Sequence, residues 1–236
     1  MVVAINLVFV GFWLSQFSGK ATYRVEKAKI IKVIDGDTIE TSLGKVRLLG
    51  INSPEKGEKG YKEAKNFLSQ FEGEEAELIS LGENKDQYGR LLRYVFCGDR
   101  FLNKEVLEKG LGHVYFYEKD GFINELKKAE EKARRGGVGM WERSKKKCSR
   151  CVVLVELNSV DPGEYVLLKN VCQFNCSLIN WTIKDDANHK RMLNFSLSKE
   201  ETRKINYKGR VWNDDHDTLY LYDDSSYLVL WYRYGV

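Results

Sequence analysis

The stretch from residue 29 to residue 49 constrains the fold more than any other part of this 236-residue chain. Hydrophobic residues alternate with polar ones in three short pieces, and the sequences DGD (35–37) and LGK (43–45) separate those pieces. Alternation with a period of two, interrupted by turn residues, is typical of strands in hairpins. We therefore expect three short strands joined by tight turns.

A helix follows these strands. Ala64, Phe67, Leu68 and Phe71 lie at the i, i+3, i+4 and i+7 positions of an amphipathic helix, which Gly73 ends. The pattern further predicts two strands, at 75–81 and 91–97, and two helices, at 102–112 and 123–136. Five strands with three helices placed late in the order indicate a closed β-barrel with helices on its outside.

The sequence changes character after Trp141. The basic run RSKKK (143–147) is interpreted as a linker, and short strand-like segments with turn residues between them follow it. These segments are VVLVEL, EYVLLKN, SLINWTIKD, NFSL, DTLYLYD and YLVLWYRYG. Six or seven such strands predict an antiparallel sandwich. We expect a boundary near residue 147, with domains at 22–147 and 148–236.

The first residues are a separate case. Residues 2–19 are largely apolar and carry no charged side chain. The run is short for a membrane span, and the small residues Gly19 and Ala21 suit cleavage after residue 21. Residues 1–21 are therefore interpreted as a signal peptide or a membrane anchor, with an ordinary hydrophobic element as the third alternative. The first two predict a secreted or membrane-anchored extracellular protein.

Charge is distributed unevenly. Residues 22–147 hold 26 basic and 22 acidic side chains, whereas residues 148–236 hold 11 and 12. The first domain is therefore the better candidate for a polyanionic partner, although a net charge of +4 is mild for a protein that coats nucleic acid. The charge permits such a partner without identifying it.

Polar residues gather at the predicted turns and strand ends of the first domain. They are Asp35, Asp37, Arg47, Asn52, Glu55 and Arg90. A carboxylate or guanidinium among strand hydrophobics is costly unless it is exposed or paired. Cleavage of a phosphodiester has a use for this set, because oxygen ligands hold a hard cation, a carboxylate acts on water, and guanidinium groups stabilise the phosphate oxygens.

The motifs VIDGDTIE, VRLLGINSPE, DQYGRLLRYVF, FLNKEVLEKGLGHVYFY and GMW occur in this order between about residues 28 and 142. This stretch closely resembles the staphylococcal nuclease (thermonuclease) family. The resemblance implies a five-stranded OB-fold barrel with three helices. It also implies a Ca²⁺ cofactor and hydrolysis of the 5′-O–P bond of single-stranded DNA and RNA, which leaves 3′-phosphates.

The same resemblance implies roles for individual residues. Asp37 matches the metal carboxylate, and Asp35 matches an acidic residue in the metal's second shell. Arg47 and Arg90 match the two phosphate-binding arginines. Glu55 matches the carboxylate that acts on the attacking water.

Other positions match the family through looser features. Ser53 stands where the family offers a backbone carbonyl to the metal. Tyr88, Tyr115 and Tyr117 match aromatic positions beside the bound nucleotide. Asn52 departs from the pattern, because a second metal-binding Asp stands there in the founding member. An amide oxygen still ligates Ca²⁺, so we expect weaker metal affinity with activity retained.

A second class of function stays open. Barrels of this fold also act as catalytically inactive nucleic-acid-binding or surface-interaction modules, and a fold does not fix a function. Such a module has no need for Asp37, Arg47, Glu55 and Arg90 together, which favours the enzyme. We expect a monomer.

Four cysteines open the second domain. Cys148 and Cys151 precede Cys172 and Cys176, and Cys97 stands alone in a predicted strand. The spacing fits a structural zinc site, whereas an exported chain uses such thiols as disulfides. Both alternatives are open, and free buried cysteines are the third, with disulfides favoured over zinc.

Residues 151–236 resemble the lamin tail domain, through VVLVELN, EYVLLKN, SLINWTIKDD and the closing VWNDDHDTLYLYDDSSYLVLWYRYG. The resemblance implies an immunoglobulin-like β-sandwich that serves adhesion or targeting, toward nucleic acid or the cell envelope. The slight negative charge of this domain argues against a broad electrostatic grip on DNA.

Overall fold

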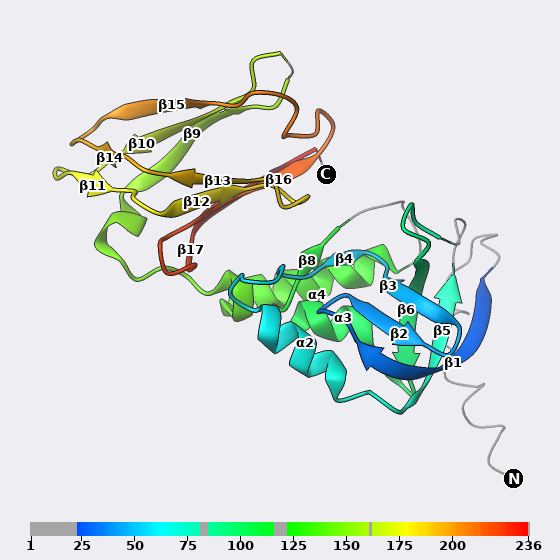
Figure 1. Cartoon of the computed structure of the whole chain (residues 1–236). Helices are drawn as coiled ribbons and strands as arrows, with labels where there is room; N and C mark the ends of the chain where they lie inside the picture. The colour runs from blue at the N-terminus through cyan, green and yellow to red at the C-terminus, as the bar shows by residue number, and fades with distance from the viewer. Residues whose placement is uncertain (1–22, 81–84, 116–121, 161, 236) are drawn as a thin grey trace, which may run out of the picture. The chain divides into compact units, whose positions relative to one another are not determined.

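The computed structural model describes residues 23–80, 85–115, 122–160 and 162–235 (Figure 1). The predicted signal or anchor at 1–21 and the predicted nucleotide contact Tyr117 lie outside these residues. The chain divides into two compact units, Met1–Met140 and Trp141–Val236. The division falls a few residues before the boundary expected near 147. No helix among the described residues is long and apolar enough to cross a membrane.

The first unit contains a closed five-stranded barrel. Its strands are β1 (Arg24–Val33), β2 (Thr38–Thr41), β3 (Gly44–Leu48), β5 (Glu75–Ser80) and β6 (Leu91–Cys97). Antiparallel pairing gives the order β3-β2-β1-β5-β6, and a parallel pairing of β3 with β6 closes the barrel. A register shift in β1 between Ile30 and Lys32 lets this long strand bend and pair with both β2 and β5. The mainly β class with a closed barrel, expected for an OB-fold, is confirmed.

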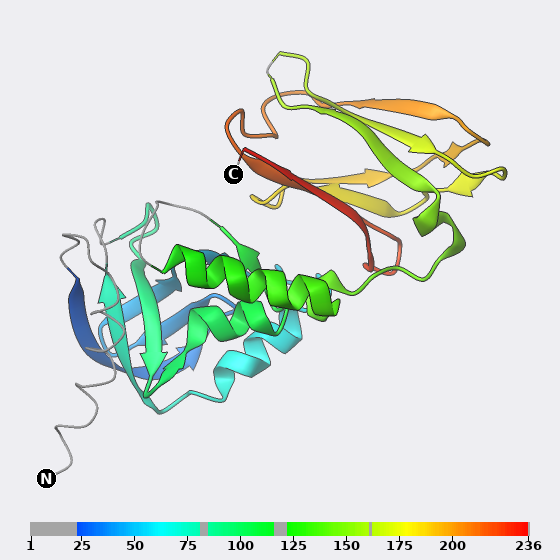
Figure 2. The same cartoon turned by 180° about the vertical axis from the view of Figure 1, so that it is seen from behind.

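Three helices accompany the barrel among the residues that the structure describes, as predicted. They are α2 (Tyr61–Ser69), α3 (Leu102–Glu108) and α4 (Ile123–Gly136), and α3 and α4 lie side by side in Figures 1 and 2. Helix α3 ends earlier than the sequence pattern indicated. Gly110 takes a left-handed φ of 64°, and its Cα lies so close to the backbone of Val138 that a Cβ there would meet the Val138 carbonyl oxygen at 2.1 Å.

Two short pairings complete this unit. Strand β4 (Ile51–Asn52) pairs with β8 (His113–Val114), and β7 (Arg100–Phe101) pairs with the end of β6. Two-residue strands have too few positions for an alternating pattern, so the sequence did not reveal them. The β4–β8 pairing positions the segment that carries Asn52 and Ser53.

The second unit contains two main sheets that share one hydrophobic core. One sheet has the order β15 (Thr202–Asn206), β10 (Tyr165–Asn170) and β9 (Val152–Asn158). The other has the order β13 (Lys190–Leu193), β12 (Trp181–Lys184), β16 (Asp217–Tyr222) and β17 (Leu228–Tyr234), and a small pair joins β11 (Cys176–Ser177) to β14 (Ser196–Leu197). Val166 and Leu168 of the first sheet and Ile183 and Leu219 of the second belong to one buried cluster. The immunoglobulin-like, lamin-tail relationship stays a prediction.

Two disulfides fix the start of this unit. Cys148 is bonded to Cys176, and Cys151 is bonded to Cys172. Of the arrangements left open for these cysteines, the structure therefore contains the disulfides. Cys97 is a buried free thiol in β6.

Candidate active site

Asp37 lies at the centre of the predicted site. It directly precedes β2, and its side chain is almost completely buried. The Ser53 backbone N–H and hydroxyl donate to Asp37 Oδ2 at 2.8 and 2.9 Å, and the Thr38 hydroxyl donates to Asp37 Oδ1 at 3.0 Å. Arg47 Nε lies 3.4 Å from the same Oδ1 atom. A buried carboxylate with this many donors is held in one orientation.

Gly36 explains how the DGD turn reaches this position. A Cβ at residue 36 would lie 2.4 Å from the Ala64 Cβ of helix α2 and 2.8 Å from the Ser53 Cβ. Only glycine lets the backbone approach both neighbours this closely. The turn is therefore seated between α2 and the segment that follows β4, and that seating brings Asp37 to Ser53.

Arg47 joins two parts of the site. It lies on β3, and β2–β3 pairing places it directly opposite Thr38. Its Nη2 group donates to Asn52 Oδ1 at 2.9 Å, and Nη1 donates to the carbonyl of Leu48 at 2.8 Å. Because its side chain is only 5% exposed, these contacts fix the direction of the guanidinium.

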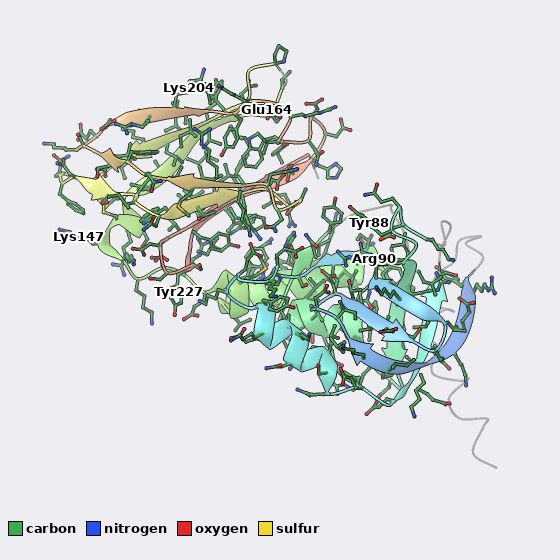
Figure 3. All side chains as sticks on the ribbon, in the orientation of Figure 1. Tyr88, Arg90, Lys147, Glu164, Lys204 and Tyr227 are labelled. Atoms are coloured by element: carbon green, nitrogen blue, oxygen red, sulfur yellow. A yellow bond between two sulfur atoms is a disulfide. The ribbon has the colours of Figure 1, made fainter. Side chains whose placement is uncertain are left out.

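Arg90 directly precedes β6, the strand whose parallel pairing with β3 closes the barrel. Asp86 holds it through the Arg90 backbone N–H at 2.9 Å and through Nε at 2.7 Å. Arg90 Nη1 lies 3.3 Å from the Thr38 hydroxyl oxygen, which accepts its proton. Tyr88 is 75% exposed and its ring centre lies 5.5 Å from the Arg90 guanidinium carbon, and the two lie together in Figure 3.

Thr38 and Asp86 have roles here that the sequence interpretation missed. The Thr38 hydroxyl donates to Asp37 and accepts from Arg90, so it connects the central carboxylate to an arginine 52 residues away in the chain. Asp86 precedes Arg90 by four residues and forms the ion pair that orients it. Both residues lie inside the motifs DGDT and DQYGR, so their positions next to predicted site residues were the available signal.

The remaining predicted residues have different surroundings. Glu55 is exposed; its backbone N–H donates to Glu58 Oε2 at 2.6 Å, and its own carboxylate accepts no hydrogen bond within the described part of the chain. Tyr115 is half-buried, and its backbone N–H donates to the carbonyl of Gly50 at 3.0 Å. Glu55 is thus an exposed carboxylate two residues after Ser53, and the printed contacts of its backbone join it to Glu58.

Asp35 and Asp37 form a pair of neighbouring carboxyl groups. Asp35 Oδ1 accepts the Asp37 backbone N–H at 3.1 Å. Burial, reinforced by the negative charge of Asp37, raises the pKa of Asp35 from 3.8 to about 6. Burial also acts to raise the pKa of Asp37, but Arg47 and the Ser53 donors outweigh it, so this pKa lies below its usual value.

The donor set fits a hard cation such as Ca²⁺. No group of three or more His, Cys, Asp or Glu side chains suited to a metal occurs among the described residues. Calcium sites also use amide and backbone carbonyl oxygens, however. Asp37, Asp35, the Asn52 amide and the Ser53 carbonyl each offer an oxygen atom, and the Asp35 and Asp37 carboxyl groups lie next to each other in the DGD turn.

Comparisons with known proteins point to one family. A family model described as staphylococcal nuclease homologue matches residues 45–143. The chain is 33% identical over 129 residues to an uncharacterized protein of Bacillus anthracis and 32% identical over 132 residues to a thermonuclease of Staphylococcus intermedius. It is 30% identical over 129 residues to an SPbeta prophage-derived endonuclease of Bacillus subtilis.

The matched stretches cover about half of this chain, at 49%, 51% and 48%. They cover 60%, 79% and 43% of the three relatives' own lengths. Through its first unit, the chain belongs to the staphylococcal nuclease homologue family.

Proposed function

We propose that this chain is a calcium-dependent nuclease that hydrolyses phosphodiester bonds of DNA and RNA at the 5′-O–P bond and leaves 3′-phosphates. One observation carries the proposal: residues from three separate motifs contact the buried Asp37 carboxylate directly or through Thr38. Ser53 and Arg47 bond to it, and Arg90 is joined to it by the Thr38 hydroxyl. A structural role alone does not explain why two arginines, one of them partly exposed, converge on one buried acid.

Each side chain of the site has its own role in the proposed reaction. Arg47 and Arg90 bind the phosphate oxygens and stabilise the charge that grows on them as the reaction proceeds. Glu55 takes a proton from the attacking water, because its exposed carboxylate has no competing donor among the described residues. The water oxygen bonds to phosphorus, the bond to the 5′ oxygen breaks, and that oxygen takes a proton from solvent. Tyr88 offers an exposed ring on which any base can stack.

A bound calcium ion would supply charge neutralisation for the phosphate. Asp37, the Asn52 amide and the Ser53 carbonyl are the groups that would hold it, and Asp35 would support them. Asn52 also accepts a hydrogen bond from Arg47, so the proposed metal ligand and a phosphate-binding arginine are physically linked.

The alternative is a catalytically inactive OB-fold module that binds nucleic acid or a surface partner. It accounts for the basic residues but assigns no task to Glu55. We further propose that the protein is exported, because structural disulfides are typical of oxidising compartments and residues 2–19 are largely apolar.

The test is cleavage of labelled single-stranded DNA and RNA by the full chain, with calcium and with chelator. Glu55→Ala and Arg90→Ala are the diagnostic variants, each expected to lower kcat at least about 100-fold. Glu63→Ala, which removes an exposed acid of α2, and Arg135→Ala, which removes an exposed arginine of α4, are the matched controls. If the parent protein does not cleave with calcium, or if all four variants cleave equally, the enzyme proposal is wrong and the binding module stands.

A further inference from the structure

Residues 143–150, here called the basic turn, have an unusual charge for the second unit. Their sequence RSKKKCSR contains five basic side chains and no acidic one. Residues 151–236 contain 10 basic and 12 acidic side chains. The excess positive charge of this unit is therefore concentrated in one short segment.

The basic turn is a rigid part of the fold and not the linker that its composition suggested. Its last residues form the short helix η2 (Lys147–Arg150), in which Cys148 is disulfide-bonded to Cys176. Cys151, which follows it directly, is bonded to Cys172. At the other end, the Ser144 N–H donates to the carbonyl of Leu228 at 2.9 Å.

Hydrogen bonds within and beside the turn fix it further. The Ser144 hydroxyl donates to Asp223 Oδ2 at 2.6 Å. The Ser149 hydroxyl lies within hydrogen-bond distance of the carbonyls of Lys146 and Ser144, at 2.6 and 3.0 Å. Covalent bonds and hydrogen bonds thus hold the backbone of the turn on both sides, so the attachment points of its cations are fixed. Less conformational entropy is lost when a partner binds to such a surface.

Three of the five cations are exposed and have no acidic partner among the described residues. Arg143 donates to the carbonyl of Val229 at 3.0 Å, and Lys146 pairs with Asp224. Lys145, Lys147 and Arg150 are exposed and form no ion pair with the residues that the structure describes. Lys147 Nζ lies 3.7 Å from the centre of the Phe174 ring, at the outer edge of the unit in Figure 3.

We propose that the basic turn binds the phosphate backbone of single-stranded nucleic acid, as a second contact outside the catalytic unit. The proposal rests on the proposed function only in its choice of polyanion, since the first unit is assigned the same substrate. Three exposed cations on a fixed backbone, without acidic partners among the described residues, suit a chain of phosphates and carry no sequence preference. The surface would hold a long strand to the enzyme between cleavage events, so its effect should grow with strand length.

The experiment measures binding of the full chain to a labelled single strand of about 60 nucleotides, well beyond the roughly 4–16 nucleotides that one OB fold occupies. Chelator is present, so no strand is cut. The variant Lys145→Gln/Lys147→Gln/Arg150→Gln should weaken binding roughly 10- to 100-fold at 0.1 M salt. It should also lower the slope of log K against log salt by about 2, because each phosphate contact contributes about 0.7.

The matched control is Lys190→Gln/Lys204→Gln/Lys208→Gln. It removes three exposed cations from the same unit, and one of them, Lys204, also lies over an aromatic ring, that of Tyr165 at 3.6 Å. This control should bind like the parent, and circular dichroism melting of both triple variants should match the parent. Equal loss of DNA affinity in both triple variants would overturn the proposal, as would no loss in either.

Two further arms separate this proposal from others. Vesicles of phosphatidylcholine and phosphatidylglycerol test a membrane surface: if the basic-turn variant loses vesicle binding and keeps DNA binding, the partner is a lipid surface and the proposal fails. Calcium-dependent cleavage of a four-nucleotide strand, about the smallest site of an OB fold, should be unchanged in the basic-turn variant. If the parent does not cleave at all while the variant still loses DNA affinity, the nuclease proposal fails and the basic turn stands.

Discussion

Replacing Asn52 by Asp should tighten calcium binding about tenfold. In the structure, Asn52 Oδ1 accepts a hydrogen bond from Arg47 Nη2 at 2.9 Å, and Arg47 Nε lies 3.4 Å from Asp37 Oδ1. An aspartate at residue 52 keeps the oxygen ligand that the Asn52 amide offers and adds a negative charge to it. The change alters the charge of the donor set while leaving its shape nearly the same.

Two opposing effects determine how much Asn52→Asp raises the calcium affinity. A carboxylate oxygen about 2.4 Å from a divalent ion gains about 3.5 kcal/mol even at the dielectric constant of bulk water. Against this, the metal-free protein gains a charge-assisted hydrogen bond from Arg47, which the ion partly displaces at a cost of about 1–2 kcal/mol. The remainder is about 2 kcal/mol, and strain in the ligand geometry lowers it toward the 1.4 kcal/mol that corresponds to tenfold.

Titration calorimetry gives the calcium affinity directly. In an activity assay, the calcium concentration needed for cleavage should rank the parent and the variant in the same order. The matched control is Asn66→Asp, which adds the same charge on an exposed position of α2 and should leave the affinity unchanged. An affinity for Asn52→Asp that is equal to or weaker than that of the parent would refute the reasoning. It would mean that residue 52 serves Arg47 and does not contribute to the metal site.

Three further predictions test other contacts. Thr38→Val should lower kcat about tenfold by uncoupling Asp37 from Arg90, whereas Thr38→Ser should keep the activity, as steady-state kinetics will reveal. Because the pKa of Asp35 is raised from 3.8 to about 6, it should make the metal-free fold lose stability as the pH rises from 4 to 6, and Asp35→Asn should reduce this loss in urea unfolding at each pH. Cys151→Ser combined with Cys172→Ser opens a bridge across a separation of 21 residues and should cost about 2–3 kcal/mol in denaturant unfolding, less than for an isolated loop because the outer disulfide still restrains the chain.

The barrel was predictable from sequence because turn residues separate its short apolar segments, although only β1 alternates between exposed and buried residues and β2 and β6 are almost wholly buried. Helix α2 was predictable from the helical spacing of its apolar residues, and Ala64, Phe67 and Leu68 are buried. The second unit was harder to predict. Strand β13 has three exposed residues of four, and β15 exposes three of five, so neither gave an alternating signal strong enough to count as a strand. They were recognised only through their pairing with β12 and β10.

The basic turn shows why composition alone misleads. A run of lysines with no apolar side chain has no pattern to distinguish a linker from a structured segment. What orders the segment is the pair of disulfides to residues 21 and 28 positions farther along the chain, and sequence alone does not determine which cysteines pair.

The site itself depends on a contact that no local pattern predicts. Hairpin pairing of β2 with β3 places Thr38 opposite Arg47, and this follows from the short turn between them. Arg90, in contrast, arrives only because β3 and β6 pair in parallel, with Val46 opposite Leu91, the residue directly after Arg90. Parallel partners are joined by long connections, and here the connection includes α2 and β5. Arg90 can therefore reach Thr38 only when the parallel β3–β6 pairing has closed the barrel. Formation of the complete site thus requires closure of the whole barrel.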